Sequence, residues 1–513
     1  MKLNYKRTIL VGFAFFLISA FWQAYDATIP VILTNKFGMS QTWSGVIMAL
    51  DNILALFMLP LFGALSDKCR SKYGKRTPFI VFGTIVAAVA LLGLSFVDSM
   101  QLKNISAVSK IDDPAALEVI YDSQKDVTLQ TPEGESFVLG DVMTKEKFMA
   151  IRSAGEVGTN PEYTQFVVPA RQAYAKQITH SNPTALILFI ALLLVILVAM
   201  ATFRSPAVAL MPDVTIKPLR SRANAVINLM GTAGGILVLV LGTVFATSAV
   251  RNQMMTYTAY YGVISAVMLL SLAIFILTVR EPAWSRQMQQ EAVALGIEEE
   301  EQPEESQSKR KLGKSEARSL IFILFSIALW YFGYNAVTSK YAVYAGNILN
   351  MDYNTTLLLA QAAAIIAYIP AGQLAAKIGR KKTIMLGVVM LTAAFGCASF
   401  LRSGSSVIVM NVLFALAGIG WATINVNSFP MVVEMCSGSD IGRYTGYYYT
   451  ASMAAQVATP MISGYLMDQM GMTVLFPYAA VFAGLAFVSM IFVRHGDGRI
   501  VAKKGLEALD IED

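Results

Sequence analysis

The sequence predicts an all-α membrane protein of twelve transmembrane helices in two six-helix halves, with an extracytoplasmic insertion between helices 3 and 4. Two observations support this fold class. Hydrophobic residues make up 55% of the 513 residues and charged residues only 14%, a balance typical of polytopic membrane proteins rather than soluble enzymes. Landmarks of the first half also return in the second half at matched spacing, which indicates a duplicated helical bundle.

The duplication is read from pairs of equivalent polar and glycine residues. The pairs are Asp26 with Asn335, Gly63 with Gly372, Asp213 with Glu434, and Arg222 with Arg443. The first two pairs are 309 residues apart and the last two are 221 apart. The first half therefore holds 88 extra residues between Gly63 and Asp213. Duplicated bundles of this kind usually bind a solute where the halves meet and rock around it.

Each predicted span is a segment of about 20 or more mostly apolar residues, the length that crosses a bilayer. The twelve segments are 8–33, 42–66, 77–98, 184–211, 223–249, 256–279, 317–341, 356–376, 383–401, 405–430, 444–467 and 473–493. We interpret the first as a span rather than a signal peptide because it is long, carries Gln23 and Asp26, and lacks a clear cleavage site. The expected parts are then a half at 1–282, a linker at 283–316, a half at 317–493 and a tail at 494–513.

Lys and Arg gather in the loops on one side, which predicts that this side is cytoplasmic. The basic segments are the N-terminus and residues 67–76, 213–222 and 377–382, whereas the opposite loops hold little beyond Lys36, Arg251, Lys340 and Arg402. Both termini are therefore expected in the cytoplasm, with the protein in the plasma membrane. The net charge of +6 follows from this bias and requires no nucleic-acid partner.

Two soluble segments interrupt the pattern. In the outer insertion, residues 99–183, stretches of alternating apolar and polar residues flank Pro132-Glu133-Gly134, which predicts a β-hairpin. Residues 161–180 are expected to be helical. The insertion is either a cap with a role in substrate access or a tolerated loop elaboration. The linker carries an acidic run and then a basic one, which is typical of a flexible tether.

A glycine-rich, basic motif lies between spans 2 and 3 and returns between spans 8 and 9. The first copy contains Gly63, Asp67, Arg70, Gly74 and Arg76, and the second contains Gly372, Ala376, Gly379 and Arg380. We expect Asp67 to bond neighbouring helices in one conformation and to release them in another. The charges Asp213, Arg222, Glu434 and Arg443 are predicted gate partners of these loops, the alternative being ordinary charge placement at helix ends.

This pair of loops resembles the conserved loop of the major facilitator superfamily. Residues 67–80 and 205–213 further resemble the sucrose–proton symporters and the broader glycoside–pentoside–hexuronide symporters. The resemblance covers the spans and not the insertion. Val208 stands where sucrose carriers usually have Arg, and Arg204 lies one turn earlier on the same face. Ala55 and Leu59 replace the acids of the melibiose-type cation site, which argues against a sodium site.

Three ionisable residues lie well inside predicted spans: Asp26, Asp51 and Arg204. Such groups are costly in a membrane and are functional candidates by default. We expect Asp26 to be the carboxylate that carries a coupling proton, whose binding responds to substrate and to Arg204, whereas Asp51 is a second candidate or lies near the outer interface in contact with water. The alternative for all three is a structural ion pair or hydrogen-bond brace between helices.

Aromatic and amide side chains in the spans form the predicted sugar site, because sugars present both hydroxyls and apolar faces. The candidates are Trp22, Gln23, Tyr25, Asn52, Tyr331, Tyr334, Asn335, Gln361, Trp421, Asn425 and Gln456. Any one of them alone is more often a helix-packing hydrogen bond than a ligand. Their gathering at similar depth favours a polar cavity.

The sequence thus predicts a proton-coupled importer of a di- or oligosaccharide or a glycoside. It is expected to work as a monomer in the lipid bilayer without cofactor or metal. A proton-coupled exporter of drugs or metabolites and a non-transporting membrane sensor remain alternatives. An enzyme is not expected, and no phosphate-binding Gly-rich loop is present in the sequence to use ATP.

Overall fold

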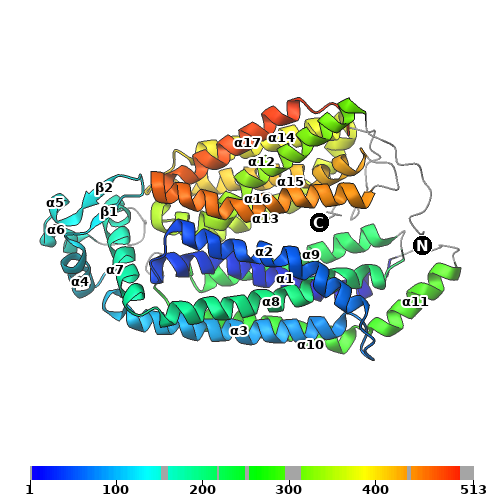
Figure 1. Ribbon diagram of the computed structural model, residues 1–513, viewed down its shortest axis with the longest axis horizontal. Coiled ribbons are helices and arrows are strands. Elements are labelled where there is room, and N and C mark those ends of the chain that lie inside the picture. The colour runs from blue at the N-terminus through cyan, green and yellow to red at the C-terminus, as the bar shows by residue number, and fades with distance from the viewer. Residues whose placement is uncertain are drawn as a thin grey trace.

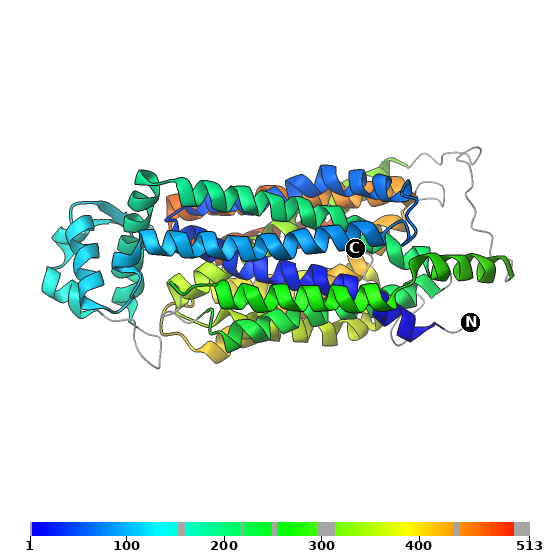
Figure 2. The same cartoon turned by 90° about the horizontal axis from the view of Figure 1, so that it is seen from below.

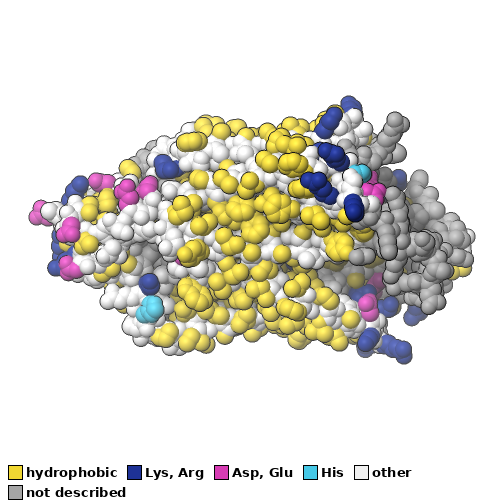
Figure 3. Space-filling model, turned by 45° about the horizontal axis from the view of Figure 1, so that its top comes forward, with side chains coloured by type: hydrophobic (Ala, Val, Ile, Leu, Met, Phe, Trp, Pro, Cys, Tyr) yellow, Lys and Arg dark blue, Asp and Glu magenta, His cyan; other side chains and the backbone are white. Residues whose placement is uncertain are grey.

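The computed structural model describes residues 3–151, 160–216, 219–248, 254–294, 313–435 and 441–496. Its long helices form two bundles that lie side by side (Figure 1). The insertion sits at one end of the bundles, and the N-terminus lies at the other end (Figure 2). Between these ends the surface is mostly hydrophobic, and Lys and Arg gather at the end opposite the insertion (Figure 3). We call the two ends the cap side and the basic side.

Each half contributes six long helices. The N-terminal half has α1 (Tyr5–Val31), α2 (Gln41–Asp67), α3 (Thr77–Asn104), α8 (Thr184–Asp213), α9 (Arg220–Val244) and α10 (Thr258–Thr278). The C-terminal half has α12 (Lys314–Tyr344), α13 (Tyr353–Ile378), α14 (Arg380–Ala398), α15 (Val407–Val433), α16 (Ile441–Met470) and α17 (Leu475–Ile491). Within the described residues, 11 of these helices are long and apolar enough to cross a membrane. The twelfth long helix, α16, has 30 residues and belongs to the C-terminal bundle. The predicted twelve-helix, two-half fold is confirmed.

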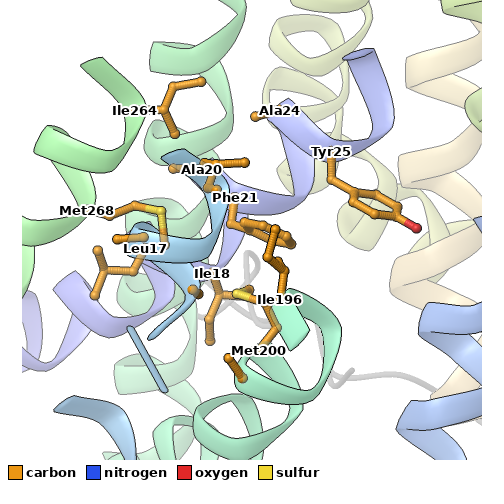
Figure 4. Close-up of a cluster of buried hydrophobic side chains, with 14 of the residues drawn as sticks. Leu17, Ile18, Ala20, Phe21, Ala24, Tyr25, Ile196, Met200, Ile264 and Met268 are labelled. Carbon is orange, nitrogen blue, oxygen red and sulfur yellow. The ribbon is translucent and has the colours of Figure 1, made fainter. Parts of the chain in front are cut away.

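Apolar side chains fill the interior of each half. In the N-terminal half one cluster joins α1, α8 and α10 (Figure 4), with these labelled members: Leu17, Ile18, Ala20, Phe21, Ala24, Ile196, Met200, Ile264 and Met268. The two halves touch most closely where α2 crosses α16. A Cβ on Gly45 would lie 2.0 Å from the Pro460 carbonyl oxygen, and one on Gly464 would lie 2.2 Å from the Gln41 carbonyl oxygen. Glycine at both positions therefore permits this crossing.

The insertion forms a small unit, which we call the cap. After the 3₁₀ turn η2 (Ser106–Val108), it contains α4 (Pro114–Gln124), β1 (Thr128–Gln130), β2 (Ser136–Val138), α5 (Leu139–Val142), α6 (Lys145–Ala150), η3 (Tyr163–Val167) and α7 (Val168–Ser181). The two strands pair antiparallel with Leu129 opposite Phe137, so the predicted hairpin is confirmed, as is the helix expected at 161–180. A separate cluster that includes Leu117, Phe148 and Tyr163 gives the cap its own core.

Two helices extend beyond their predicted ends. On the cap side α1 continues as the π-helical turn η1 (Ile32–Lys36), and α12 continues as η6 (Ala345–Leu349). The prediction that Lys36 and Lys340 are loop residues is therefore wrong, and both are 0% exposed. Lys36 pairs with Asp98 at 2.7 Å and also donates to the Met255 carbonyl. Burial of these charges is tolerated because each has close partners.

The first part of the expected linker is helical rather than flexible. Residues Glu281–Ala294 form the helix α11, where a flexible segment was expected from residue 283. Arg7 of α1 donates to Gln287 at 2.5 Å and lies 4.9 Å from the centre of the Trp284 ring. These contacts hold α11 against the basic side of the N-terminal half. Most of the expected linker, and the tail beyond residue 496, lies outside the described residues.

Candidate functional site

Two carboxylates from neighbouring helices meet between the halves. Asp26 of α1 and Asp51 of α2 lie close enough for their charges to interact. Asp51 accepts hydrogen bonds from the backbone nitrogen of Asn52 at 2.6 Å and from its Nδ2 at 2.8 Å. The Asp26 side chain is exposed although it lies inside a continuous helix, ten residues before the end of η1 at Lys36. Because a charge at that depth is too costly to face lipid, Asp26 faces water-accessible space inside the protein.

Arg204 of α8 supplies a positive charge to the same region. Its side chain is exposed, its charge interacts with that of Asp51, and its guanidinium carbon lies 5.9 Å from the centre of the Trp22 ring. This distance is within the range of a cation–π interaction. Arg204 and the two carboxylates therefore form one electrostatic cluster, carried on α8, α1 and α2.

The C-terminal half faces this cluster with an aromatic wall. Tyr334 of α12 stacks on Trp421 of α15, with ring centres 3.7 Å apart and planes 4° apart. Tyr331 meets the same indole edge-on at 5.2 Å. Tyr334 also lies close enough to Asp26 to feel its charge. The wall thus offers flat apolar surface near a carboxylate, which is the combination that a sugar requires.

Several buried polar atoms around the cluster have no hydrogen-bond partner within the described residues. They are Trp22 Nε1, the Tyr25 hydroxyl and Asn335 Nδ2. In Figure 4 Tyr25 lies at the edge of the apolar cluster, with its ring centre 6.0 Å from that of Phe21 and its hydroxyl directed away from the cluster. Buried polar groups normally have partners, so these three atoms are available to a ligand or to water.

One hydrogen bond crosses between the halves at this depth. Gln361 of α13 donates from Nε2 to Gln23 Oε1 of α1 at 2.5 Å. Gly235 of α9 leaves room for this amide pair, because its Cβ would lie 3.5 Å from Gln361 Oε1 and 3.7 Å from Gln23 Oε1. The remaining two predicted site residues, Asn425 of α15 and Gln456 of α16, are half-buried, and the structure gives no contact from their side chains to the cluster.

On the basic side, Arg76 joins three segments of the N-terminal half. It contacts Asp67 at the end of α2 at 2.5 Å, Asp213 at the end of α8 at 2.8 Å, and the Ser66 hydroxyl at 2.5 Å. Burial opposes the charge of Arg76, but the bonds to Asp213 and Asp67 outweigh it and raise the pKa of Arg76 above its ordinary value. The predicted contact between the motif loop and Asp213 is therefore present, and Gly63 lies near Ser205.

Sequence analysis missed the residue that holds this loop. Glu281 of α11 accepts hydrogen bonds from the backbone nitrogens of Lys75 at 2.6 Å and Thr77 at 2.8 Å, and from Arg76. It thus caps the N-terminus of α3, where a negative charge is favourable. Gly74 has φ +115°, and a Cβ there would lie 2.2 Å from the Glu281 carboxyl, which explains the glycine.

The second copy of the motif forms an equivalent pair within the C-terminal half. Arg380, which follows Gly379 at φ +92°, forms a salt bridge with Glu434. Arg70 and Arg222 are exposed, and the side chain of Arg443 lies outside the described residues. The salt bridges of Arg76 and of Arg380 thus each lie within one half.

The cap side differs, because hydrogen bonds there join the two halves. Asp468 of α16 accepts from the backbone nitrogens of Gln41 at 2.8 Å and Thr42 at 2.7 Å, which are the first residues of α2. Lys340 donates to the Gln41 carbonyl at 2.7 Å. Neither residue was predicted from the sequence as part of a site.

A second junction lies on the cap side at the two π-helical turns. Asn347 of η6 donates to Asn35 of η1 at 2.9 Å, and Asn35 also donates back at 3.3 Å. A further bond joins the halves near these turns. The hydroxyl of Ser248, four residues beyond the end of α9, donates to the carboxylate of Asp352, the residue before α13. The halves are therefore tied together at the cap side by Asp468, Lys340 and the paired asparagines.

Known proteins resemble the chain in sequence and in fold. The profile of the Major Facilitator Superfamily matches residues 173–367 and 352–508, and that of the MFS/sugar transport proteins matches residues 10–104. A sucrose transport protein of Arabidopsis thaliana is 39% identical over 72 residues, 14% of this chain and 14% of that protein. A dipeptide and tripeptide permease of Enterobacter sp. (strain 638) is 27% identical over 185 residues, 34% of this chain and 36% of that protein.

The chain therefore matches well under two thirds of the length of these relatives. Among solved structures, the inward-open xylose transporter of E. coli has a TM-score of 0.55 at 15% identity, over 98% of both chains, which shows a common fold. The superfamily profile takes in more than half of the chain, and the two six-helix halves agree with it. The chain belongs to the Major Facilitator Superfamily.

Proposed function

We propose that the protein imports a sugar, either a di- or oligosaccharide or a glycoside, together with a proton, by alternating access of one central site. The observation that carries this proposal is the aromatic wall of Tyr334 and Trp421 opposite the carboxylates Asp26 and Asp51. Carboxylates accept hydrogen bonds from sugar hydroxyls, and flat rings pack on sugar C–H faces. The named relative that transports sucrose is in accord with this assignment.

The coupling proton is assigned to Asp26. Two carboxylates this close repel when both are ionised, and a proton on one removes the repulsion. Asp26 is the exposed member of the pair and faces the aromatic wall, so it can exchange a proton with water and meet the substrate. A sugar entering between the halves replaces the hydrogen bond of Gln23 with Gln361, which links substrate binding to the relative position of the halves.

The orientation follows from the charge distribution. The basic side is assigned to the cytoplasm of a plasma-membrane protein, so that both termini are cytoplasmic. In this orientation the structure is the inward-facing state, closed on the outside by Asp468, Lys340 and the paired asparagines. The Arg76 cluster is then the gate on the cytoplasmic side. One copy of the chain contains every residue of the proposed site.

The test is pH recording with purified protein in proteoliposomes while a panel of sugars and glycosides is added outside. Alkalinisation of the outer medium on addition of one sugar is the expected result. It identifies the substrate class and the symport together. A panel that produces no pH change, with binding of cationic or lipophilic compounds instead, would overturn the proposal in favour of an exporter.

A second candidate is the uptake of small peptides. The opposite charges of Arg204 and Asp26 are suited to the two charged ends of a zwitterion, and one named relative transports di- and tripeptides. Dipeptides therefore belong in the same panel. Alkalinisation with a dipeptide and none with any sugar would select this function.

A further inference from the structure

We propose that the cap is a latch of the outer gate. It is carried by the N-terminal half, and its hairpin turn, residues 131–135, docks on the turn between α16 and η8 (Met472–Val474) of the C-terminal half only while the cap side is closed. The proposal rests on the proposed alternating movement of the halves and not on the identity of the substrate.

The cap is fixed firmly to the N-terminal half. Gln101 of α3 donates to the Thr179 hydroxyl of α7 at 3.0 Å and to the Lys36 carbonyl at 2.9 Å. Gly38, at φ +65°, lies so close to α7 that a Cβ would be 2.3 Å from the Lys176 nitrogen. Both ends of the cap also continue into helices of this half, α3 and α8. The cap and the N-terminal half therefore move as one body.

Among the described residues, backbone atoms of two turns join the cap to the C-terminal half, and the charge of Glu133 in the hairpin turn also acts on Tyr344 of α12. Thr473 donates its backbone N–H to the Pro132 carbonyl at 3.2 Å. Gly134 and Gly471 face each other at φ +93° and φ +91°, and a Cβ on Gly471 would lie 2.4 Å from the Gly134 nitrogen. The two turns thus fit only because both positions lack a side chain. A single hydrogen bond and a fitted pair of glycines suit a contact that forms and breaks repeatedly.

The turn on which the hairpin docks, residues 470–473, directly follows α16, the helix that bonds α2 at the cap side. Met470 ends α16, and Asp468, two residues earlier, holds the first turn of α2. When α2 and α16 separate on the cap side, the 470–473 turn leaves α2 and must also leave the hairpin, because the hairpin stays with the N-terminal half. Gln172 of α7 donates to Asn35 of η1 at 2.8 Å, which is a further bond between the cap and the N-terminal half.

The test measures opening of the cap side directly, in the full-length chain with its native cysteines replaced by serine. Spin labels are placed at Val244 of α9 and at Phe400, just beyond α14, which are exposed by 73% and 83%. Gly134→Val removes the fit and should raise the population with a long distance between the labels about fivefold, the effect of one hydrogen bond. An unchanged distribution overturns the latch.

A disulfide pair keeps the test decisive if Gly134→Val does not fold. Oxidised Pro132→Cys/Thr473→Cys should lose the long-distance population, and reduction should restore it. The matched control is Gln101→Cys/Thr179→Cys, which joins the cap to its own half and should leave the distribution unchanged when oxidised. Long distances that persist in the oxidised test pair, or that disappear in the oxidised control, contradict the proposal. Neither readout needs substrate, so failure of the sugar assignment is detected separately.

Discussion

Charged side chains inside this protein fall into two groups by their surroundings. Lys36, Asp98 and Lys340 are fully buried and bonded to close partners. Asp26 and Arg204 are exposed in mid-helix, where only water inside the protein can reach them. The first group braces the structure, because removing one partner leaves an uncompensated buried charge. The second group can change its proton or its ligand without unfolding the bundle.

At the residue scale, Asp26→Asn is expected to abolish uphill accumulation of substrate while exchange of substrate across the membrane continues. The amide keeps the shape and hydrogen-bonding capacity of the side chain but cannot carry a proton. Accumulation and counterflow in proteoliposomes measure the two activities. Asp122→Asn in the cap, which removes an exposed acid paired with Lys145, is the control and should change neither. Undiminished accumulation would remove Asp26 as the proton carrier.

Asp468→Ala is expected to open the cap side. The carboxylate accepts two backbone hydrogen bonds and one from the Thr42 hydroxyl at 2.5 Å. Hydrogen bonds to charged groups are worth about 1.5 kcal/mol or more, so the open population should rise at least about tenfold. The distance between labels at Val244 and Phe400 reports it. Asp468→Asn should have a smaller effect, and equal effects of the two variants would mean that the charge has no part in closure.

The sequence predicted the residues of the central cluster but not those of the outer closure. Asp26 and Arg204 stand out because long apolar runs surround them. Lys340 and Asp468 lie near the predicted ends of spans, where a charge is ordinary. Their roles depend on contacts of α12 and α16 with the first turn of α2, which bring together residues 299 and 427 positions apart. Periodicity within one segment contains no information about that contact.

At the scale of elements, the motif loop behaves as a joint between α2, α3 and α8. Its glycine and charge pattern predicted that Asp213 lies against the basic loop, and the structure gives that contact through Arg76, which also bonds Asp67. The hydrogen bonds from the loop backbone to Glu281 were not predicted. Glu281 begins a helix about 200 residues later, and composition indicated that most of that helix would be flexible.

Asp67→Ala should slow turnover about tenfold, the effect of one charged hydrogen bond, with little change in substrate affinity. The bond lies at the end of α2, far from the central cluster, so it affects movement rather than binding. Initial uptake rates and equilibrium binding on the same preparation separate the two quantities. Arg70→Ala, at an exposed position of the same loop, is the control. A normal uptake rate in Asp67→Ala would mean that the loop has no role in gating and only sets the orientation of the helices in the membrane.

At the scale of the whole molecule, the cap is expected to be dispensable for folding. It has its own core, and α3 ends at Asn104 and α8 begins at Thr184, so neither helix includes residues 106–181. Replacing residues 106–181 with a short flexible linker should give a monodisperse carrier that still binds substrate. Size-exclusion chromatography and substrate binding test this. Aggregation, or loss of all binding, would show that the bundle or the site requires the cap.

The anchored helix α11 determines how the covalent connection between the halves acts. Because α11 is bonded to Arg76 and Arg7, the chain leaves the N-terminal half at the end of α11, Ala294, and enters α12 at Lys314. The 19 residues between them can extend to about 65 Å. A connection that can extend this far does not restrict the movement of the two halves relative to each other. A chain cut between residues 295 and 312 should therefore reassemble from two separately synthesised polypeptides, each carrying one complete bundle.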